Sequence, residues 1–171
     1  MTRYFIWFLS LFLLLVVQAG VLVPLHLAPV NLILIMVVVA VILSDFDFGL
    51  ILAILGGLLL DFVSGSSDGL ATMSLLGAFL VLFFVVNTVL SREVSQIILF
   101  TSVIASTVSY FIFFLLFNQL FRIFGLSANL SVNYILTTEL PLTLLFNIIF
   151  TYPVFQYYLW LQKLTHSKKV A

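Results

Sequence analysis

The sequence predicts an all-α integral membrane protein: a compact six-helix transmembrane bundle with both termini in the cytoplasm. Three observations predict this fold class. First, 64% of the 171 residues are hydrophobic, only 7% are charged and the mean hydropathy is +1.37, whereas a soluble domain needs far more polar surface. Second, the apolar residues fall into runs close to the roughly 20 residues of a spanning helix. Third, the few basic residues gather on one side of the predicted membrane.

Six apolar segments are the candidate spans, and together they make residues 1–171 a single polytopic membrane domain. They lie at about 4–23, 29–44, 48–63, 70–90, 96–118 and 134–161. Turn signals separate them: "PLHLAP" with its two prolines, "SDFDFG", "SGSSDG", "SREVS" and one long loop. The second and third segments are short, so a re-entrant hairpin is an alternative to two full spans there.

The first segment and the long loop each have an alternative interpretation. "VQA" offers a signal-peptide cleavage site after Ala19, but the apolar run continues through Val23. Such a run is long for a signal peptide, so we interpret the segment as an uncleaved span. In the loop, "FRIFGL" could lie flat at the outer interface with Phe121 and Phe124 in lipid. An ordinary ordered loop is the alternative.

Lysine and arginine orient the chain. With the N-terminus inside, the cytoplasmic side carries five basic residues and the outer side carries only Arg122. The five are Arg3, Arg92, Lys163, Lys168 and Lys169. Cytoplasmic segments of membrane proteins show this excess of positive charge. Because the number of crossings is even with either interpretation of the third segment, both termini are expected in the cytoplasm.

Small residues indicate which helix faces touch, because helices associate in lipid by close packing. In the third segment they recur at every fourth position, which places them on one side of a helix: Gly49, Ala53, Gly57, Asp61 and Gly65. The fourth segment offers Gly69 and Gly77, and the fifth offers Ser102 and Ser106. We therefore expect segments three to five to form the inner bundle. Self-association through the same small residues is the alternative.

Asp61 lies on this small-residue face, near the outer end of its helix. Both features lower the free-energy cost of placing this carboxylate in the membrane below the ~2.5–3.5 kcal/mol expected for an acid at the bilayer centre. The run "SGSSD" then breaks the helix, and Ser67 or Asp68 can cap the start of the next one. Capping is the role we expect for Asp68. Asp61 is either a polar lock that hydrogen-bonds to the following turn, or an acid that contacts a partner or ligand. Whether a lipid or small ligand occupies a groove near Asp61 stays open.

The chain offers no arrangement of residues for catalysis, a cofactor or a metal. It has no cysteine, and its histidines, His26 and His166, sit in no motif. The close acid pair Asp45 and Asp47 is explained by a solvated turn, and no glycine-rich phosphate loop is present. Glu139 and Arg122 share the outer side with Asp61 and could form a small polar cluster there. We expect no enzyme and no nucleic-acid partner.

The stretch "GGLLLDFVSGSSDGLATMSLLGAFLVLF" resembles the central signature of the rod-shape-determining membrane protein MreD family. There a glycine-containing helix ends in an aspartate, a small-residue turn follows, and a glycine opens the next helix. The matching residues are Gly57, Asp61, Ser64, Gly65, Ser66 and Gly69. Asn147 and Pro153 in the last span, and Pro29 and Asn31 before the second, also resemble the family pattern. Asp68 departs from it, since an apolar residue or proline is more usual there.

The resemblance implies a non-enzymatic scaffold of the cell-elongation machinery in the cytoplasmic (inner) membrane. It implies association with an MreC-like bitopic partner, and through it with MreB filaments and peptidoglycan synthases. Asp61 and the turn to Gly69 would serve the fold of the outer face or an interface there. The alternative is a substrate-binding subunit of an energy-coupling-factor-type vitamin transporter. Those subunits dock through small residues on the first helix, where this chain has only Ala19 and Gly20.

Overall fold

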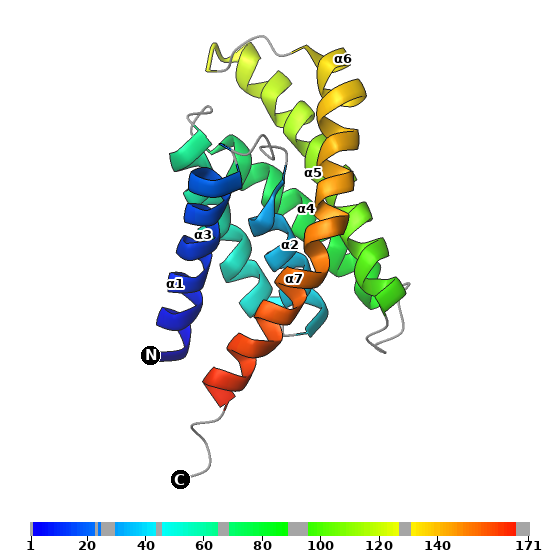
Figure 1. Cartoon of the computed structure of the whole chain (residues 1–171). Helices are drawn as coiled ribbons and strands as arrows, with labels where there is room; N and C mark the ends of the chain where they lie inside the picture. The colour runs from blue at the N-terminus through cyan, green and yellow to red at the C-terminus, as the bar shows by residue number, and fades with distance from the viewer. Residues whose placement is uncertain are drawn as a thin grey trace.

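The computed structural model describes residues 2–22, 24, 30–43, 46–64, 69–88, 96–126 and 131–166. All the secondary structure in these ranges is helical (Figure 1). The elements are α1 (Thr2–Val17), π-helical η1 (Gln18–Leu22), α2 (Leu32–Leu43), α3 (Phe46–Ser64), α4 (Leu70–Thr88), α5 (Gln96–Ile123), α6 (Val132–Tyr134), π-helical η2 (Ile135–Glu139) and α7 (Leu140–His166). The prediction of an all-helical protein is confirmed.

Four helices in the described part of the chain are long and apolar enough to cross a membrane. They are Phe46–Val63, Leu70–Asn87, Gln96–Ile123 and Val132–Lys163. The apolar helices Ile6–Leu22 and Leu32–Leu43 are shorter. These lengths and compositions indicate a membrane protein. Helix α1 begins and helix α7 ends at the same end of the bundle (Figure 1). The number of crossings and the side that faces the cytoplasm stay predictions.

Helix α2 forms the centre of the molecule. Every residue from Leu32 to Val41 is buried, and α3, α4, α5 and α7 all pack against it. A helix that is apolar on all sides belongs in an interior. Its 12 residues extend only about 18 Å, less than the ~30 Å of a bilayer core. The expectation that segments three to five alone form the inner bundle is therefore incomplete, although α3, α4 and α5 do pack on one another.

The predicted small residues lie between helices. A Cβ added to Gly57 would come within 2.5 Å of the Thr72 Cα, and one added to Gly77 within 2.5 Å of the Phe113 ring. At Gly49 an added Cβ would lie 3.0 Å from side-chain atoms of Phe79 and Val41. Ala53, Ser102 and Ser106 are also buried. These contacts bring α3, α4 and α5 together inside one chain.

The segment "FRIFGL" forms the last residues of α5 and the turn that closes this helix. Helix α5 extends to Ile123, five residues past the expected end. Gly125 then takes a positive φ of +73. The Gly125 N–H donates to the Arg122 carbonyl (3.0 Å), and the Leu126 N–H donates to the Phe121 carbonyl (2.9 Å). This pair of bonds is a Schellman cap. Neither alternative, a separate surface helix or an ordinary loop, describes this segment, because residues 121–123 continue α5 and a glycine that accepts positive φ then closes the helix.

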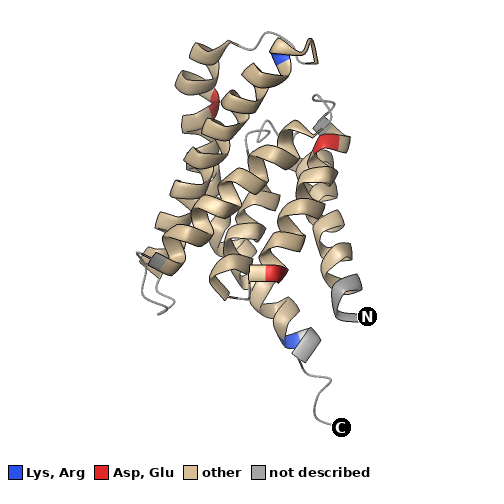
Figure 2. Cartoon of the chain, turned by 180° about the vertical axis from the view of Figure 1, so that it is seen from behind, with Lys and Arg blue, Asp and Glu red and all other residues tan. Residues whose placement is uncertain are grey.

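The helices differ in how far they extend. At the end opposite the termini, α5 and the start of the last helical run rise beyond the other helices (Figure 1). Among the residues that Figure 2 colours, the charged ones lie at isolated positions along the helices. Large exposed side chains such as Phe62, Phe84 and Ile97 suit a surface that faces lipid.

Candidate functional site

The Asp61 carboxylate binds the start of helix α4. Its Oδ1 accepts a hydrogen bond from the Ala71 N–H (2.7 Å). Its Oδ2 accepts from the Thr72 N–H (3.0 Å) and from the Thr72 hydroxyl (2.5 Å). These are the second and third amides of α4, which have no carbonyl partner within their own helix. The negative charge also lies at the positive end of the helix dipole. Asp61 therefore caps α4 from the end of α3.

This geometry corrects the predicted cap. Ser67 and Asp68 lie outside the described residues, and Asp61 holds the two amides that such a cap would use. Gly69 takes the position before the first residue of α4, with φ +91, and its carbonyl accepts from the Met73 N–H at 2.9 Å. Of the other predicted motif residues, Ser64 ends α3, while Gly65 and Ser66 lie outside the described residues. Of the two interpretations of Asp61, the polar lock describes these contacts.

Gly57 and Asp61 act on the same partner. Gly57 lies one helical turn before Asp61, and the Thr72 Cα occupies the space where its Cβ would be. A larger residue at 57 would push α4 away and move the Thr72 amide and hydroxyl out of reach of the carboxylate. The glycine and the aspartate together fix the α3–α4 hairpin at this end.

Asn147 makes a second connection between helices, deep in the bundle. It is fully buried. Its Oδ1 accepts from the Asn31 N–H (2.9 Å), and its Nδ2 donates to the Thr107 hydroxyl oxygen (3.0 Å). The Thr107 hydroxyl donates onward to the Val103 carbonyl (2.7 Å). One side chain of α7 thereby joins the start of α2 to α5.

Three backbone amides at the buried start of α2 donate to side chains. Besides the bond from Asn147, Gln18 Oε1 accepts from the Leu32 N–H (2.9 Å) and Asn31 Oδ1 accepts from the Leu34 N–H (3.0 Å). Free backbone amides are costly away from water. The sequence analysis missed Gln18 and Thr107. The signal for them was a helix start inside an apolar protein, which requires acceptors from elsewhere in the chain.

Pro153 lies within α7 on an exposed face. Proline lacks the N–H that would bond to the carbonyl four residues earlier. The helix nevertheless continues to His166. Pro153 is not among the residues that surround Asp61, Asn147 or the cavity described next.

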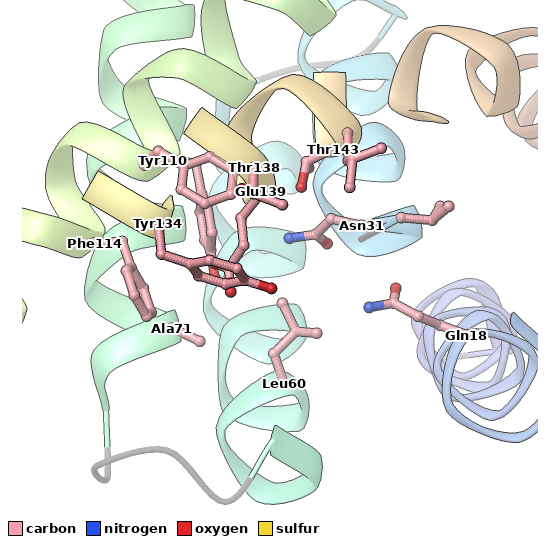
Figure 3. A pocket seen from close by; sticks show the side chains of 13 residues that line it. Gln18, Asn31, Leu60, Ala71, Tyr110, Phe114, Tyr134, Thr138, Glu139 and Thr143 are labelled. Atoms are coloured by element: carbon pink, nitrogen blue, oxygen red, sulfur yellow. The ribbon is translucent and has the colours of Figure 1, made fainter. Parts of the chain in front are cut away.

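A cavity of about 460 Å³ lies among the helices (Figure 3). The starts of α2 and α4 border it, and so do the middle of α5, η2 and the start of α7. Its apolar lining consists of Val30, Leu60, Ala71, Phe111, Phe114 and Leu142. Its polar lining consists of Gln18, Asn31, Tyr110, Tyr134, Thr138, Glu139 and Thr143. Leu60 and Ala71 place the cavity directly beside the Asp61 cap. A volume of this size is typical of small-molecule sites.

The lining of the cavity contains one of the three residues of the expected polar cluster, Asp61, Glu139 and Arg122. Glu139 does lie near the Asp61 region, across the cavity from Leu60 and Ala71. Arg122 does not line the cavity; it lies in the last turn of α5. The seven polar lining residues come from four separate segments, so no local motif in the sequence indicates them.

Comparison of the chain with protein-family models, with curated proteins and with solved structures gives no match. The function must therefore be argued from the residues and their geometry.

Proposed function

We propose that this protein is a non-enzymatic scaffold of the machinery that elongates rod-shaped cells. It resides in the cytoplasmic (inner) membrane and associates with an MreC-like bitopic partner. Through that partner it connects to MreB filaments and to peptidoglycan synthases. The resemblance of residues 56–83 to the MreD family signature is the starting point of this proposal.

One structural observation supports it most. The polar residues that carry the resemblance, Asp61 and Asn147, both place their side chains on helix starts. Each holds two or more helices in a fixed relation. Such residues build a rigid bundle, and a rigid bundle with apolar outer faces suits packing against the transmembrane helix of a partner.

Co-purification tests the proposal. The tagged protein would be extracted from its native membrane in mild detergent, and the bound proteins identified by mass spectrometry. We expect a bitopic scaffold together with cell-wall synthases. A pair of ATPases with a transmembrane coupling subunit would overturn the proposal. A matched control is Gly20→Ala, since nothing lies within 4 Å of the added methyl group and the complex should survive it.

A second candidate function is the substrate-binding subunit of an energy-coupling-factor-type vitamin transporter. The cavity favours it, because seven of its thirteen lining residues are polar, and a ligand site needs several polar groups. The outer face of α1 opposes it. Exposed side chains on this helix are large: Phe8, Leu9, Phe12, Leu13 and Val16. They leave no small-residue stripe for docking along this part of the first helix.

A further inference from the structure

The cavity has two chemically different sides. Tyr134, Tyr110 and Glu139 extend into it from one side, and Asn31 and Gln18 face them from the other (Figure 3). Phe111 and Phe114 add two more rings to the first side. A ligand that fills the cavity must therefore suit aromatic rings and a carboxylate at one end and amides at the other.

Glu139 gives the first side its charge. It is the one acidic residue in the lining, and the lining contains no lysine, arginine or histidine. Among the described residues no hydrogen bond or ion pair to its carboxylate is formed. A half-buried carboxylate in an apolar protein is stabilised by a cation. Aromatic rings attract cations to their faces as well, so the two kinds of group favour the same ligand charge.

The second side offers hydrogen-bond donors. The Gln18 and Asn31 side-chain oxygens already accept from the amides of α2, which fixes the orientation of both amide groups. Their nitrogens are then directed into the cavity (Figure 3), where no acceptor among the described residues meets them. Thr143, also buried, adds a hydroxyl to the lining. These groups suit an oxygen acceptor on the ligand.

The backbone is adapted at the same place. Both π-helical segments in the described structure, η1 and η2, supply lining residues: Gln18 comes from η1, and Thr138 and Glu139 come from η2. A π-helical turn is wider than an α-helical turn and is rare in proteins. Where such a turn occurs, it is often at a functional site. Two such turns facing one cavity are difficult to explain by packing.

We propose that the cavity binds a zwitterionic ligand in which an ammonium group lies a few atoms from an oxygen acceptor. Glu139 pairs with the ammonium group, and the rings of Tyr110, Phe111, Phe114 and Tyr134 surround it. The amides of Gln18 and Asn31 donate to the oxygen end. Free amino-alcohol phosphates have this chemistry, and so does the headgroup of a zwitterionic phospholipid. The site does not depend on the scaffold function proposed above and adds a ligand to it.

Binding to the purified full chain tests this proposal. The first arm titrates free phosphoethanolamine and phosphocholine by isothermal calorimetry, with thermal unfolding in parallel. The second arm adds phosphatidylethanolamine or phosphatidylglycerol to the delipidated protein and reads bound lipid by native mass spectrometry. The variants are Glu139→Gln, Tyr134→Leu and Tyr134→Phe. Asp47→Asn removes the same charge on α3, at a residue that does not line the cavity.

We expect saturable binding in one of the two arms. Glu139→Gln should weaken it about tenfold or more, as for a lost charged partner. Tyr134→Leu should weaken it about fivefold and Tyr134→Phe little, because phenylalanine keeps the ring face. Because Tyr134 is 55% exposed, both variants at this position should fold. Asp47→Asn should bind as the natural protein does.

The arms separate the two sources. Binding of the free headgroup compounds assigns a soluble ligand. Retention of phosphatidylethanolamine over phosphatidylglycerol, without binding of the free compounds, assigns a lipid. Absence of binding in both arms would overturn the proposal, and so would binding that Glu139→Gln leaves unchanged. None of these results alters the co-purification test of the scaffold function, so the two proposals fail separately.

Discussion

Replacing Asp61 tests how much one carboxylate contributes to the bundle. Asp61→Leu removes the acceptor for two amides and one hydroxyl. A lost helix cap costs about 1 kcal/mol, the lost charge at the helix start about 0.5 kcal/mol, and the lost bond from a hydroxyl to a charged group about 1.5 kcal/mol. The leucine recovers little, because lipid solvates it as well as protein does. The expected loss is about 3 kcal/mol in the free energy of unfolding.

Asp61→Asn separates the parts of this loss. The amide keeps one oxygen acceptor but turns an NH₂ group toward the second backbone amide, so we expect about half the loss. The assay is reversible unfolding in mixed micelles of mild detergent and dodecyl sulfate, followed by fluorescence of the buried Trp7. Asp47→Asn, an exposed acid in the first turn of α3, should cost less than about 0.5 kcal/mol. Equal stability of the leucine variant and the natural protein would refute the capping role.

Two further predictions concern packing and the buried start of α2. Gly57→Ala should destabilise the protein by about 1–3 kcal/mol, because the methyl group would meet the Thr72 Cα at 2.5 Å; the same unfolding assay should show almost no effect of Gly20→Ala, where nothing lies within 4 Å. Asn147→Leu leaves the buried Asn31 N–H without its acceptor, so the free energy of unfolding should fall by about 3 kcal/mol. The yield of folded protein after extraction should fall with it, and this yield is the quantity to measure. Normal yield and stability of this variant would contradict the role of Asn147.

The positions of the helices could be predicted because lipid restricts the choices. A spanning chain must form helices, and prolines, glycines and charges mark where they end. The spacing of Gly49, Ala53 and Gly57 likewise indicated one packing face. The end of α5 was missed because Gly125 continues and then closes the helix through a cap, which hydropathy does not detect.

The burial of α2 and the partners of the polar residues were harder to predict. In a membrane protein an apolar helix can face lipid or protein, so composition alone does not distinguish them. One of the two interpretations of Asp61 placed its donors in the following turn, but the cap of α4 was assigned to Ser67 or Asp68. Which donors it meets depends on the close approach of α3 and α4 at Gly57. A groove near Asp61 was considered from the sequence, but the residues that line the cavity were not predicted, because contacts between distant segments form it.

The side-chain partners of α2 have a consequence for the order of biosynthesis. The amides at its start are held by Gln18, which is made before α2, and by Asn147, which the ribosome adds more than a hundred residues later. Until the last helix is inserted, the Asn31 N–H lacks its final acceptor. The core of this protein therefore closes only after α7 has been made and inserted. A chain truncated before Asn147 should be left open at its centre and become a substrate for membrane proteases.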